Sequence, residues 1–187
     1  MKRVMAEMDM VGAAKGSLSD VRRLYSTHAS ELRLALNRLG GSGVDCDDLL
    51  QEVFVVAMRK LSDLAQARSE RAWLYGVAVK IAAGQRRRNR MRSWFGLDRA
   101  PEPMSVESPA RTLEQKEASV LLQQALDSLP VAKRDVLVLF ELQGLSGDEV
   151  AHALEVPVAT VWTRLFHARK ALSAAVQRIE ARGRRLE

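Results

Sequence analysis

The sequence has little of what most catalytic and metal sites are built from. Its 187 residues include one cysteine and three histidines, and the histidines, His28, His152 and His167, lie far apart along the chain. It contains neither a phosphate-binding glycine loop nor a zinc-ligand spacing. One cysteine, Cys46, cannot form an internal disulfide, which is typical of a protein of the reducing cytoplasm. These absences predict a protein that is not an enzyme and has no cofactor, catalytic residue or metal site.

Long hydrophobic runs are absent as well. The longest apolar run, residues 53–58, is far too short to cross a bilayer. Glu7 and Asp9 stand where a signal peptide would need an apolar stretch. We therefore expect a cytoplasmic protein without direct membrane insertion.

Acidic residues are outnumbered, and the excess of basic ones is local. The net charge is +6 and the sequence pI about 9.9. Residues 84–99 hold six arginines and one aspartate, whereas acidic residues predominate in 100–130. A basic balance of this kind is typical of proteins that bind nucleic acid, and a concentrated cluster is stronger evidence for such binding than the sum.

The hydrophobic pattern is helical throughout. Apolar residues recur at helical spacing, and no segment shows the alternation of a half-buried strand. Residues 93–111 contain Pro101, Pro103 and Pro109 among serines and acids, which is the composition of a linker. We predict an all-α fold: two small helical domains, 19–92 and 112–178, joined by a flexible linker over 93–111.

The C-terminal domain contains the pattern of a helix-turn-helix. Ser146 and Glu149 have the spacing of a capping box at the start of a short helix. Pro157 can open the next helix, which carries one apolar stripe. Its other face offers Thr160, Trp162, Thr163, Arg164, His167 and Lys170. Two short helices joined by a tight turn, the second polar and basic outward, fit a major groove of duplex DNA.

The helix predicted over 45–61 is apolar around most of its circumference. Asp48, Gln51 and Glu52 form a narrow polar seam along it. Such a helix either lies centrally in a core or serves as a docking face for a partner helix, with the seam as its polar contacts. The acids near Asp48 could also suggest a metal site, but acids at a helix start usually serve as caps and dipole partners.

The helix predicted over 70–92 combines aromatic and basic residues. Trp73 and Tyr75 precede a run of arginines that begins at Arg86. Unstacked bases stack on aromatic rings, and phosphates pair with guanidinium groups. This helix is therefore suited to single-stranded or melted DNA. The alternative is that the aromatic rings belong to the core and the arginines form a solvated helix end.

Two other functions fit parts of this pattern. A conventional helix-turn-helix regulator would bind duplex DNA alone, but it would not need the apolar helix over 45–61. A nucleic-acid enzyme could use the acids around Asp48 to hold a metal ion, although nothing else in the sequence supports it.

The order of these features resembles the extracytoplasmic-function (ECF) group of bacterial RNA polymerase sigma factors. The segment Asp48-Leu49-Leu50-Gln51-Glu52-Val53-Phe54 looks like the helix of sigma domain two that grips the polymerase clamp. Ala72-Trp73-Leu74-Tyr75 and the arginines after Gln85 look like the segment that melts and reads the minus-ten element. Residues 126–172 look like sigma domain four, with Leu129-Pro130, Arg134 and the capping box in place.

This resemblance implies an initiation subunit that binds core RNA polymerase at its clamp helices and flap and directs promoter-specific initiation, held inactive by an anti-sigma factor. It assigns polymerase binding to Asp48, Gln51, Glu52 and Phe54. It assigns the minus-ten element to Trp73, Tyr75, Lys80, Arg86, Arg87 and Arg88. It assigns the minus-thirty-five element to Arg134, Pro157, Thr160, Trp162, Thr163, Arg164 and His167.

The sequence departs from the group's pattern at a few DNA-reading positions. Lys80 stands where asparagine is common, and Gly84 where a longer polar side chain is usual. Trp162 and His167 replace frequent basic residues, and an indole cannot make the bidentate guanine contact of an arginine. The resemblance therefore predicts a minus-thirty-five preference that differs from the commonest one of the group.

Overall fold

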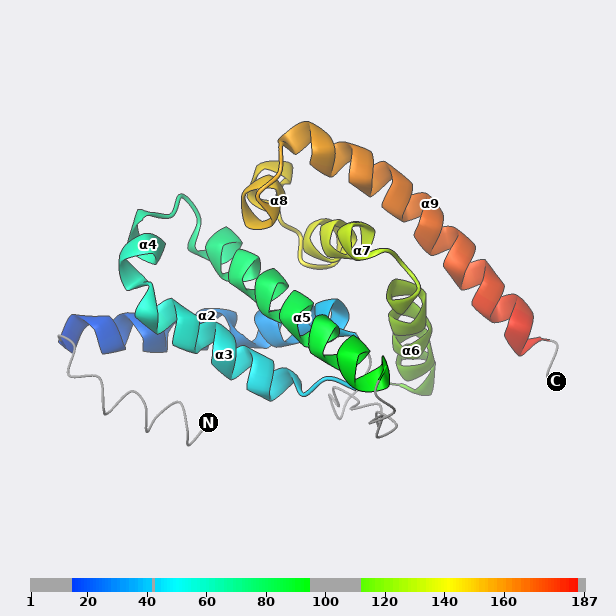
Figure 1. Ribbon diagram of the computed structural model, residues 1–187, viewed down its shortest axis with the longest axis horizontal. Helices are drawn as coiled ribbons and strands as arrows, with labels where there is room; N and C mark the ends of the chain where they lie inside the picture. The colour runs from blue at the N-terminus through cyan, green and yellow to red at the C-terminus, as the bar shows by residue number, and fades with distance from the viewer. Residues whose placement is uncertain (1–14, 42, 95–111, 185–187) are drawn as a thin grey trace.

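The computed structural model describes residues 15–41, 43–94 and 112–184, and almost all of them are helical (Figure 1). No strand occurs in these ranges, which confirms the all-α fold class. Most of the predicted linker, residues 95–111, lies outside the described residues. In chain order the elements are α2 (Lys15–Gly40), α3 (Cys46–Arg59), α4 (Leu61–Gln66), α5 (Glu70–Trp94), α6 (Leu113–Asp127), α7 (Val131–Leu137), the π-helical turn η1 (Val138–Leu142), α8 (Gly147–Leu154) and α9 (Val158–Gly183).

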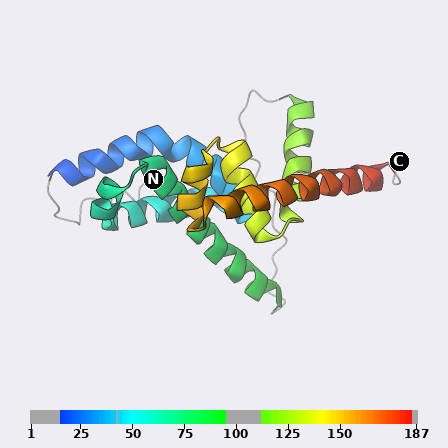
Figure 2. The same cartoon turned by 90° about the horizontal axis from the view of Figure 1, so that it is seen from above.

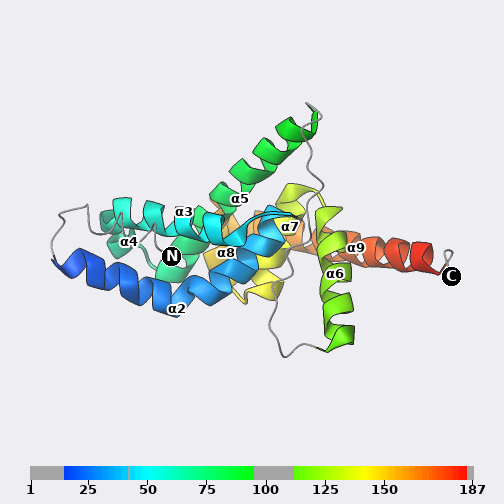
Figure 3. The same cartoon turned by 90° about the horizontal axis from the view of Figure 1, so that it is seen from below.

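The N-terminal helices α2, α3 and α5 pack against one another around an aliphatic core. Leu32 and Leu36 of α2 and Val53 of α3 are completely buried there. The C-terminal part of α5 projects away from this core, as the views from above and from below show (Figures 2 and 3). This projecting part carries the arginine run, so most of the run extends into solvent.

The C-terminal helices form a second group in which α9 contacts α6, α7 and α8. Val150 of α8 and Val161 of α9 are fully buried between the two helices. The pair α8 and α9, with the short turn between them, confirms the predicted helix-turn-helix. The C-terminal half of α9 extends beyond the rest of the group (Figure 1).

The two groups of helices are packed together. Helix α8 lies against α5, and η1 lies against α2. Buried side chains from both groups form one continuous hydrophobic cluster that runs from Val21 to Ala168. The two predicted domains are thus in extensive contact with each other.

Three local features depart from a simple succession of long amphipathic helices. The short helix α4 lies between α3 and α5. Helix α7 continues into η1, where the amide of Gln143 donates to the carbonyl of Val138 five residues earlier. In the N-terminal part of α6, Leu113 and Val120 are exposed although they are apolar.

Within the described ranges, no helix combines the length and the apolar character needed to span a membrane.

The first turn of α3 provides a stability test. Asp45 caps this helix, and its Oδ1 accepts from the amides of Asp47 at 2.9 Å and Asp48 at 3.2 Å. We expect Asp45→Ala to lower the free energy of unfolding by about 1 kcal/mol, because two amides lose their acceptor. Asp48→Ala, three residues on, is the matched control and should cost only a few tenths of that. Urea unfolding measures both, and equal losses would contradict the capping role.

Candidate nucleic-acid and polymerase interfaces

Helix α3 has one face buried in the core and an exposed polar seam on another side. Its inner face is buried, whereas Asp48 and Glu52 are exposed and Gln51 is half-buried. Glu52 has one distant ion pair, with Arg88 at 3.8 Å. The two interpretations of this helix are thus compatible, because the buried face and the polar seam occupy different sides of it.

Phe54 departs from its predicted role as a polymerase contact. Its side chain is completely buried, and its ring lies 4.9 Å from that of Tyr25. The apolar pattern of the helix did not distinguish its core side from its exposed side at this position. Phe54 therefore supports the polar seam from inside the fold and presents no surface to a partner.

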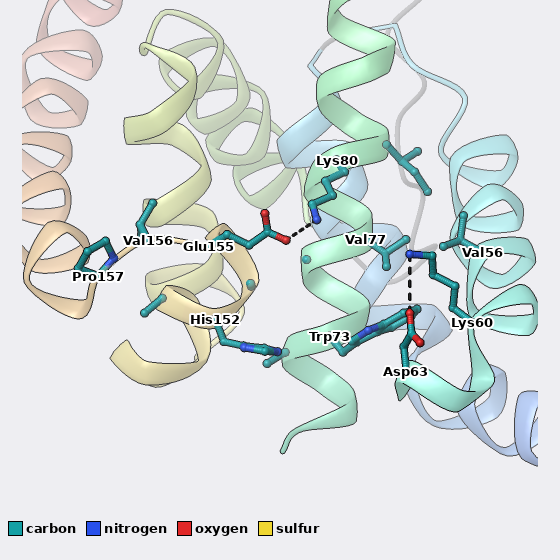
Figure 4. A pocket seen from close by; sticks show the side chains of 15 residues that line it. Val56, Lys60, Asp63, Trp73, Val77, Lys80, His152, Glu155, Val156 and Pro157 are labelled. Carbon is teal, nitrogen blue, oxygen red and sulfur yellow. Dashed lines mark hydrogen bonds and ion pairs between the residues drawn. The ribbon is translucent and has the colours of Figure 1, made fainter. Parts of the chain in front are cut away.

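The two aromatic residues early in α5 have different environments. Trp73 is half-buried and lines a cleft of about 860 Å³ between α3, α5 and α8. Figure 4 shows its ring beside Val77 and close to the paired side chains of Lys60 and Asp63. Tyr75 is fully buried, and its hydroxyl lies 2.8 Å from Oε1 of Gln143. Burial raises the pKa of Tyr75 to about 12, so its hydroxyl stays protonated and can donate to Gln143.

The basic residues of α5 fall into two sets. Arg87 and Arg88 are exposed on the projecting part, as are Arg90 and Arg92 further along. Lys80 and Arg86 instead contact the C-terminal group of helices. The amine of Lys80 lies 2.5 Å from the Glu155 carboxylate (Figure 4). Arg86 donates to the carbonyl of Leu39 and pairs with Asp135. The structure thus separates the four basic residues predicted to contact the minus-ten element into two exposed on the projecting part and two that contact the C-terminal group.

Arg86 and Asp135 form an ion pair that is almost completely buried. Arg86 Nη2 and Asp135 Oδ1 are 3.5 Å apart, and neither atom has a hydrogen-bond partner among the described residues. Burial raises the pKa of Asp135 to about 6, with Arg86, Arg134 and Arg164 acting against this rise. Burial also lowers the pKa of Arg86. Two charges have left water here for an imperfect contact, which is an unfavourable arrangement by itself.

Arg134 also departs from its predicted role. It was expected to contact minus-thirty-five DNA, but only 6% of its surface is exposed. Its guanidinium donates to the carbonyls of Leu126 at 2.8 Å and Asp127 at 2.9 Å. Arg134 therefore satisfies the carbonyls at the end of α6 and holds α6 to α7.

The turn between α8 and α9 has the predicted local chemistry. Ser146 Oγ accepts from the amide of Glu149, whose carboxylate accepts from the amide of Ser146, so both halves of the capping box are present. Helix α8 ends at Leu154, and its C-cap residue Glu155 adopts the left-handed conformation with φ of 54°. Pro157 then stands as the residue directly before α9. Burial of Val150 and Val161 fixes the angle between the two helices.

The outward face of α9 carries the remaining predicted DNA contacts. Thr163 and His167 are exposed, and Thr160 and Arg164 are half-buried. The hydroxyl of Thr163 donates to the carbonyl of Ala159, as threonines in helices often do. This face can therefore present a few polar groups and one guanidinium to a groove of DNA.

Trp162 has a structural contact that the sequence did not reveal. Its ring meets that of Phe140 edge-on, with 5.3 Å between centroids. It also covers Gly147: an ideal Cβ on this glycine would lie 2.6 Å from Cζ2 of Trp162. About half of Trp162 remains exposed. The indole therefore braces α9 against the start of α8, and only glycine at position 147 leaves room for it.

Sequence reasoning did not identify the residues that join the two groups of helices. Gln143, Glu149 and Glu155 of the C-terminal group all contact α5 or the residues before it. Their partners are about seventy or more residues away in sequence, and no local pattern reports such pairs. The sequence did contain a glycine inside the helix at this contact, Gly76, but Gly84 lies in the same helix without such a contact, so a glycine alone does not identify the position.

The acids around Asp48 have other roles than metal binding. Asp45 caps α3, and Asp47 pairs with Arg33 at 2.8 Å. Among the residues that the structure describes, no group of three or more histidine, cysteine, aspartate or glutamate side chains is placed to hold a metal ion.

Comparison with known families matches two segments of the chain. Residues 24–92 match Sigma-70 region 2, and residues 119–172 match Sigma-70, region 4. The first match covers α3 and most of α5, and the second covers the helix-turn-helix.

Several curated proteins are similar over most of their length. The RNA polymerase sigma-H factor of Pseudomonas aeruginosa is 31% identical over 144 residues, which are 71% of this chain and 74% of that protein. The RNA polymerase sigma factor NccH of Alcaligenes xylosoxydans is 28% identical over 169 residues, 88% of this chain and 91% of the relative. The ECF RNA polymerase sigma-E factor of Escherichia coli K12 is 29% identical over 172 residues, 87% and 90% of the two chains.

Two solved structures share the fold. CnrH in complex with the cytosolic domain of CnrY has a TM-score of 0.65 at 25% identity, covering 94% of this chain and 96% of that one. The sigma factor RpoE of Bartonella quintana, in complex with the anti-sigma factor NepR, has a TM-score of 0.69 at 18% identity, covering 84% and 97%.

The buried ion pair predicts a pH dependence of stability. The folded protein holds a proton on Asp135 up to about pH 6, whereas the unfolded chain releases it near its ordinary value of 3.8. Because the pKa of Asp135 is raised in the folded protein, its proton stabilises the fold fully below pH 3.8. This stabilisation is lost as the pH rises from 3.8 through about 6. Asp135→Asn cannot titrate. The difference in free energy of unfolding between wild type and Asp135→Asn should therefore change by roughly 1–3 kcal/mol over this interval. Urea titrations at a series of pH values measure it, and parallel profiles would contradict the assignment.

The contact between Trp162 and Gly147 predicts a second effect. Gly147→Ala should lower the free energy of unfolding by about 1–3 kcal/mol, because the added methyl group overlaps the indole. Gly183→Ala is the control, since nothing lies within 4 Å of a Cβ at that position. Unfolding monitored by circular dichroism provides the comparison. An alanine at 147 that is as well tolerated as one at 183 would show that Trp162 does not brace α9.

Proposed function

The chain belongs to the extracytoplasmic-function (ECF) group of RNA polymerase sigma factors, and on this premise we propose how its surfaces are divided between polymerase and promoter. As a sigma factor it is a transcription initiation factor and not an enzyme; it binds core RNA polymerase and directs initiation at specific promoters. We divide it into sigma domain two over 19–92, a linker over 93–111 and sigma domain four over 112–178. The observation that carries the proposal is the presence of both sigma regions in one chain, in order.

We assign polymerase clamp binding to the polar seam of α3. Asp48 and Glu52 are exposed and Gln51 is half-buried, so the seam can meet a partner helix without disturbing the core behind it. Phe54 keeps an indirect role through its packing under the seam. We assign the second polymerase contact, at the flap, to sigma domain four.

We assign the minus-ten element to α5. Arg87 and Arg88 are exposed on the projecting end, where they can meet phosphates, and Trp73 offers a partly exposed ring for stacking. Each phosphate neutralised on a single strand adds about −0.7 to the slope of log affinity against log salt. Lys80, Tyr75 and Arg86 belong to the same helix, but contacts with domain four engage them here.

We assign the minus-thirty-five element to the first turns of α9. This part of the helix presents Thr160, Thr163, Arg164 and His167 outward, with Pro157 at its start. A helix of this kind enters the major groove with the residues near its N-terminus against base edges. Trp162 supports α9 from the side and offers its exposed edge to sugar or methyl groups.

We propose that an anti-sigma factor controls this protein in the cytoplasm, where promoter DNA and polymerase are found. The support is the 25% identical structure of CnrH, which was solved with the cytosolic domain of CnrY. RpoE of Bartonella quintana, solved with the anti-sigma factor NepR, shares the fold.

The division of surfaces is tested by two variants that should fail in opposite ways. Asp48→Ala combined with Gln51→Ala should weaken binding to purified bacterial core RNA polymerase, because the seam loses its polar groups. Arg164→Ala should leave that binding intact and reduce promoter-specific transcription about tenfold, as expected for a charged base or phosphate contact. Pull-down and transcription from a library of genomic fragments provide the two measurements.

Circular dichroism is the control for both variants, since a loss of helicity would indicate a folding defect instead. Equal losses of polymerase binding and transcription in both variants would contradict the division. A wild-type chain that forms no complex with core polymerase and initiates at no promoter would contradict the function itself.

A further inference from the structure

Trp162 places a large apolar ring on the part of α9 that we assign to the minus-thirty-five element. It lies in the second turn of the helix, between Thr160 and Arg164, and 48% of its surface is exposed. Single exposed apolar residues are common on folded proteins, so exposure alone does not indicate a binding site. Trp162 differs from such residues because two other elements are shaped around its ring.

Two contacts hold the indole in one position. The ring of Phe140, from η1, meets it edge-on with 5.3 Å between centroids and 78° between planes. On the side of α8 the indole lies over Gly147, where an ideal Cβ would come within 2.6 Å of Cζ2 and 3.1 Å of Cη2. A side chain whose torsion angles are already fixed loses little conformational freedom when its exposed surface meets a ligand. The exposed part of Trp162 is therefore a preorganised apolar surface.

The indole, and not the backbone, accounts for the glycine beneath it. Gly147 is the first residue of α8, and its φ does not lie in the positive range that favours glycine. Glycine also loses more conformational freedom on folding than any other residue. The space that the ring of Trp162 occupies is thus the physical reason for a glycine here. It ties the position of the ring to the first helix of the helix-turn-helix.

The polar groups near Trp162 are few, and some of them are engaged. The hydroxyl of Thr163 donates to the carbonyl of Ala159 at 3.0 Å. Arg169, further along α9, pairs with Glu141 at 2.5 Å. The indole is the largest exposed group in the second turn of the helix. This part of α9 is therefore suited to an apolar feature of a base pair as well as to hydrogen-bonding groups.

Thymine has the major-groove edge that complements an indole. It presents an acceptor, O4, beside its C5 methyl group. The indole presents one N–H donor beside an apolar ring and has no acceptor. Guanine and adenine present acceptors without a methyl group, and cytosine presents a donor. Of the four bases, thymine alone matches both parts of the indole.

We propose that Trp162 is a specificity-determining residue of the minus-thirty-five contact and selects a thymine through its C5 methyl group. The methyl group packs against the exposed surface of the indole, while Phe140 and Gly147 hold the ring on the protein side. This inference rests on the proposed function, because it uses the assignment of α9 to the major groove. It adds the chemical feature that this promoter position presents, which is a methyl group and not the guanine acceptors that an arginine would read.

Deoxyuridine isolates the methyl group, because it keeps the base pairing and the O4 acceptor of thymine. A promoter is first selected by transcription with purified core RNA polymerase from templates randomised across the minus-thirty-five element. Each thymine of the selected element is then replaced singly by deoxyuridine. Removal of the methyl group that meets Trp162 should lower initiation about fourfold, as expected for one buried methyl group. Initiation by the wild-type protein that is insensitive to every such replacement would overturn the proposal.

A second pair of templates adds the methyl group instead of removing it. Cytosine in place of the sensitive thymine should lower initiation about tenfold, because it lacks the methyl group and presents a donor in place of the acceptor. 5-Methylcytosine differs from cytosine in the methyl group alone and should initiate about fourfold better than cytosine. Equal initiation with cytosine and 5-methylcytosine would contradict a methyl contact.

Two variants assign the methyl effect to a residue. Trp162→Ala should initiate equally on thymine and deoxyuridine templates, because the ring that meets the methyl group is gone. Phe166→Ala is the matched control: Phe166 is an aromatic residue one turn along α9, 56% exposed, and its removal should leave the ratio between the two templates intact. Each ratio compares two templates with one protein, so a general loss of stability cancels. A ratio that persists in Trp162→Ala, or one that disappears in Phe166→Ala, would overturn the proposal.

Trp162→Arg gives a gain of specificity, which is measurable even if the alanine variant is poorly active. Arginine makes a bidentate contact with guanine, so selection with this variant should exchange the thymine for a guanine. Selection of the same thymine would overturn the proposal. A wild-type chain that initiates at no promoter would contradict the proposed function itself, whereas initiation without methyl dependence would overturn this inference alone.

Discussion

The close approach of α5 and α8 is the constraint on which the arrangement of this protein depends. Gly76 lets the backbone of Ala153 come within contact distance, and this contact aligns Lys80 with Glu155 and Tyr75 with Gln143. With a larger residue at position 76 the two helices would have to move apart, and the polar pairs around them would lose part of their fit. One residue without a side chain thus sets the spacing of α5 and α8 within the hydrophobic cluster that the two groups share.

The contact between the two groups of helices combines apolar and charged components. Apolar burial gains stability in proportion to its area, whereas the cost of removing two charges from water cancels much of the Coulomb attraction between them. Arg86 and Asp135 are the extreme case, because both are almost completely buried and neither facing atom is hydrogen-bonded within the described residues. The hydrophobic cluster that the two groups share therefore contributes more to the contact than this ion pair.

Local sequence patterns predicted the helices, the capping box of Ser146 and Glu149, and the polar seam of α3, because each depends on residues a few positions apart. They assigned Phe54 and Arg134 to partner surfaces although both are buried, and they left open whether Tyr75 belongs to the core, where the structure places it. Arg134 finds its carbonyl acceptors in α6, and Tyr75 finds Gln143 across the domain contact, so their burial depends on which helices meet. Trp162 shows the same limit: its support of α9 depends on Phe140 and on the space above Gly147. Amphipathic periodicity gives the faces of a helix but not its neighbours.

The account makes one chain an adaptor that meets core RNA polymerase through the polar seam of α3 and promoter DNA through α5 and α9. The most direct test is cross-linking from a photoreactive amino acid at Glu52 or at His167, in the complex with core polymerase and promoter DNA. The account predicts a cross-link to polymerase from position 52 and a cross-link to DNA from position 167. Cross-links to the opposite partners would contradict it.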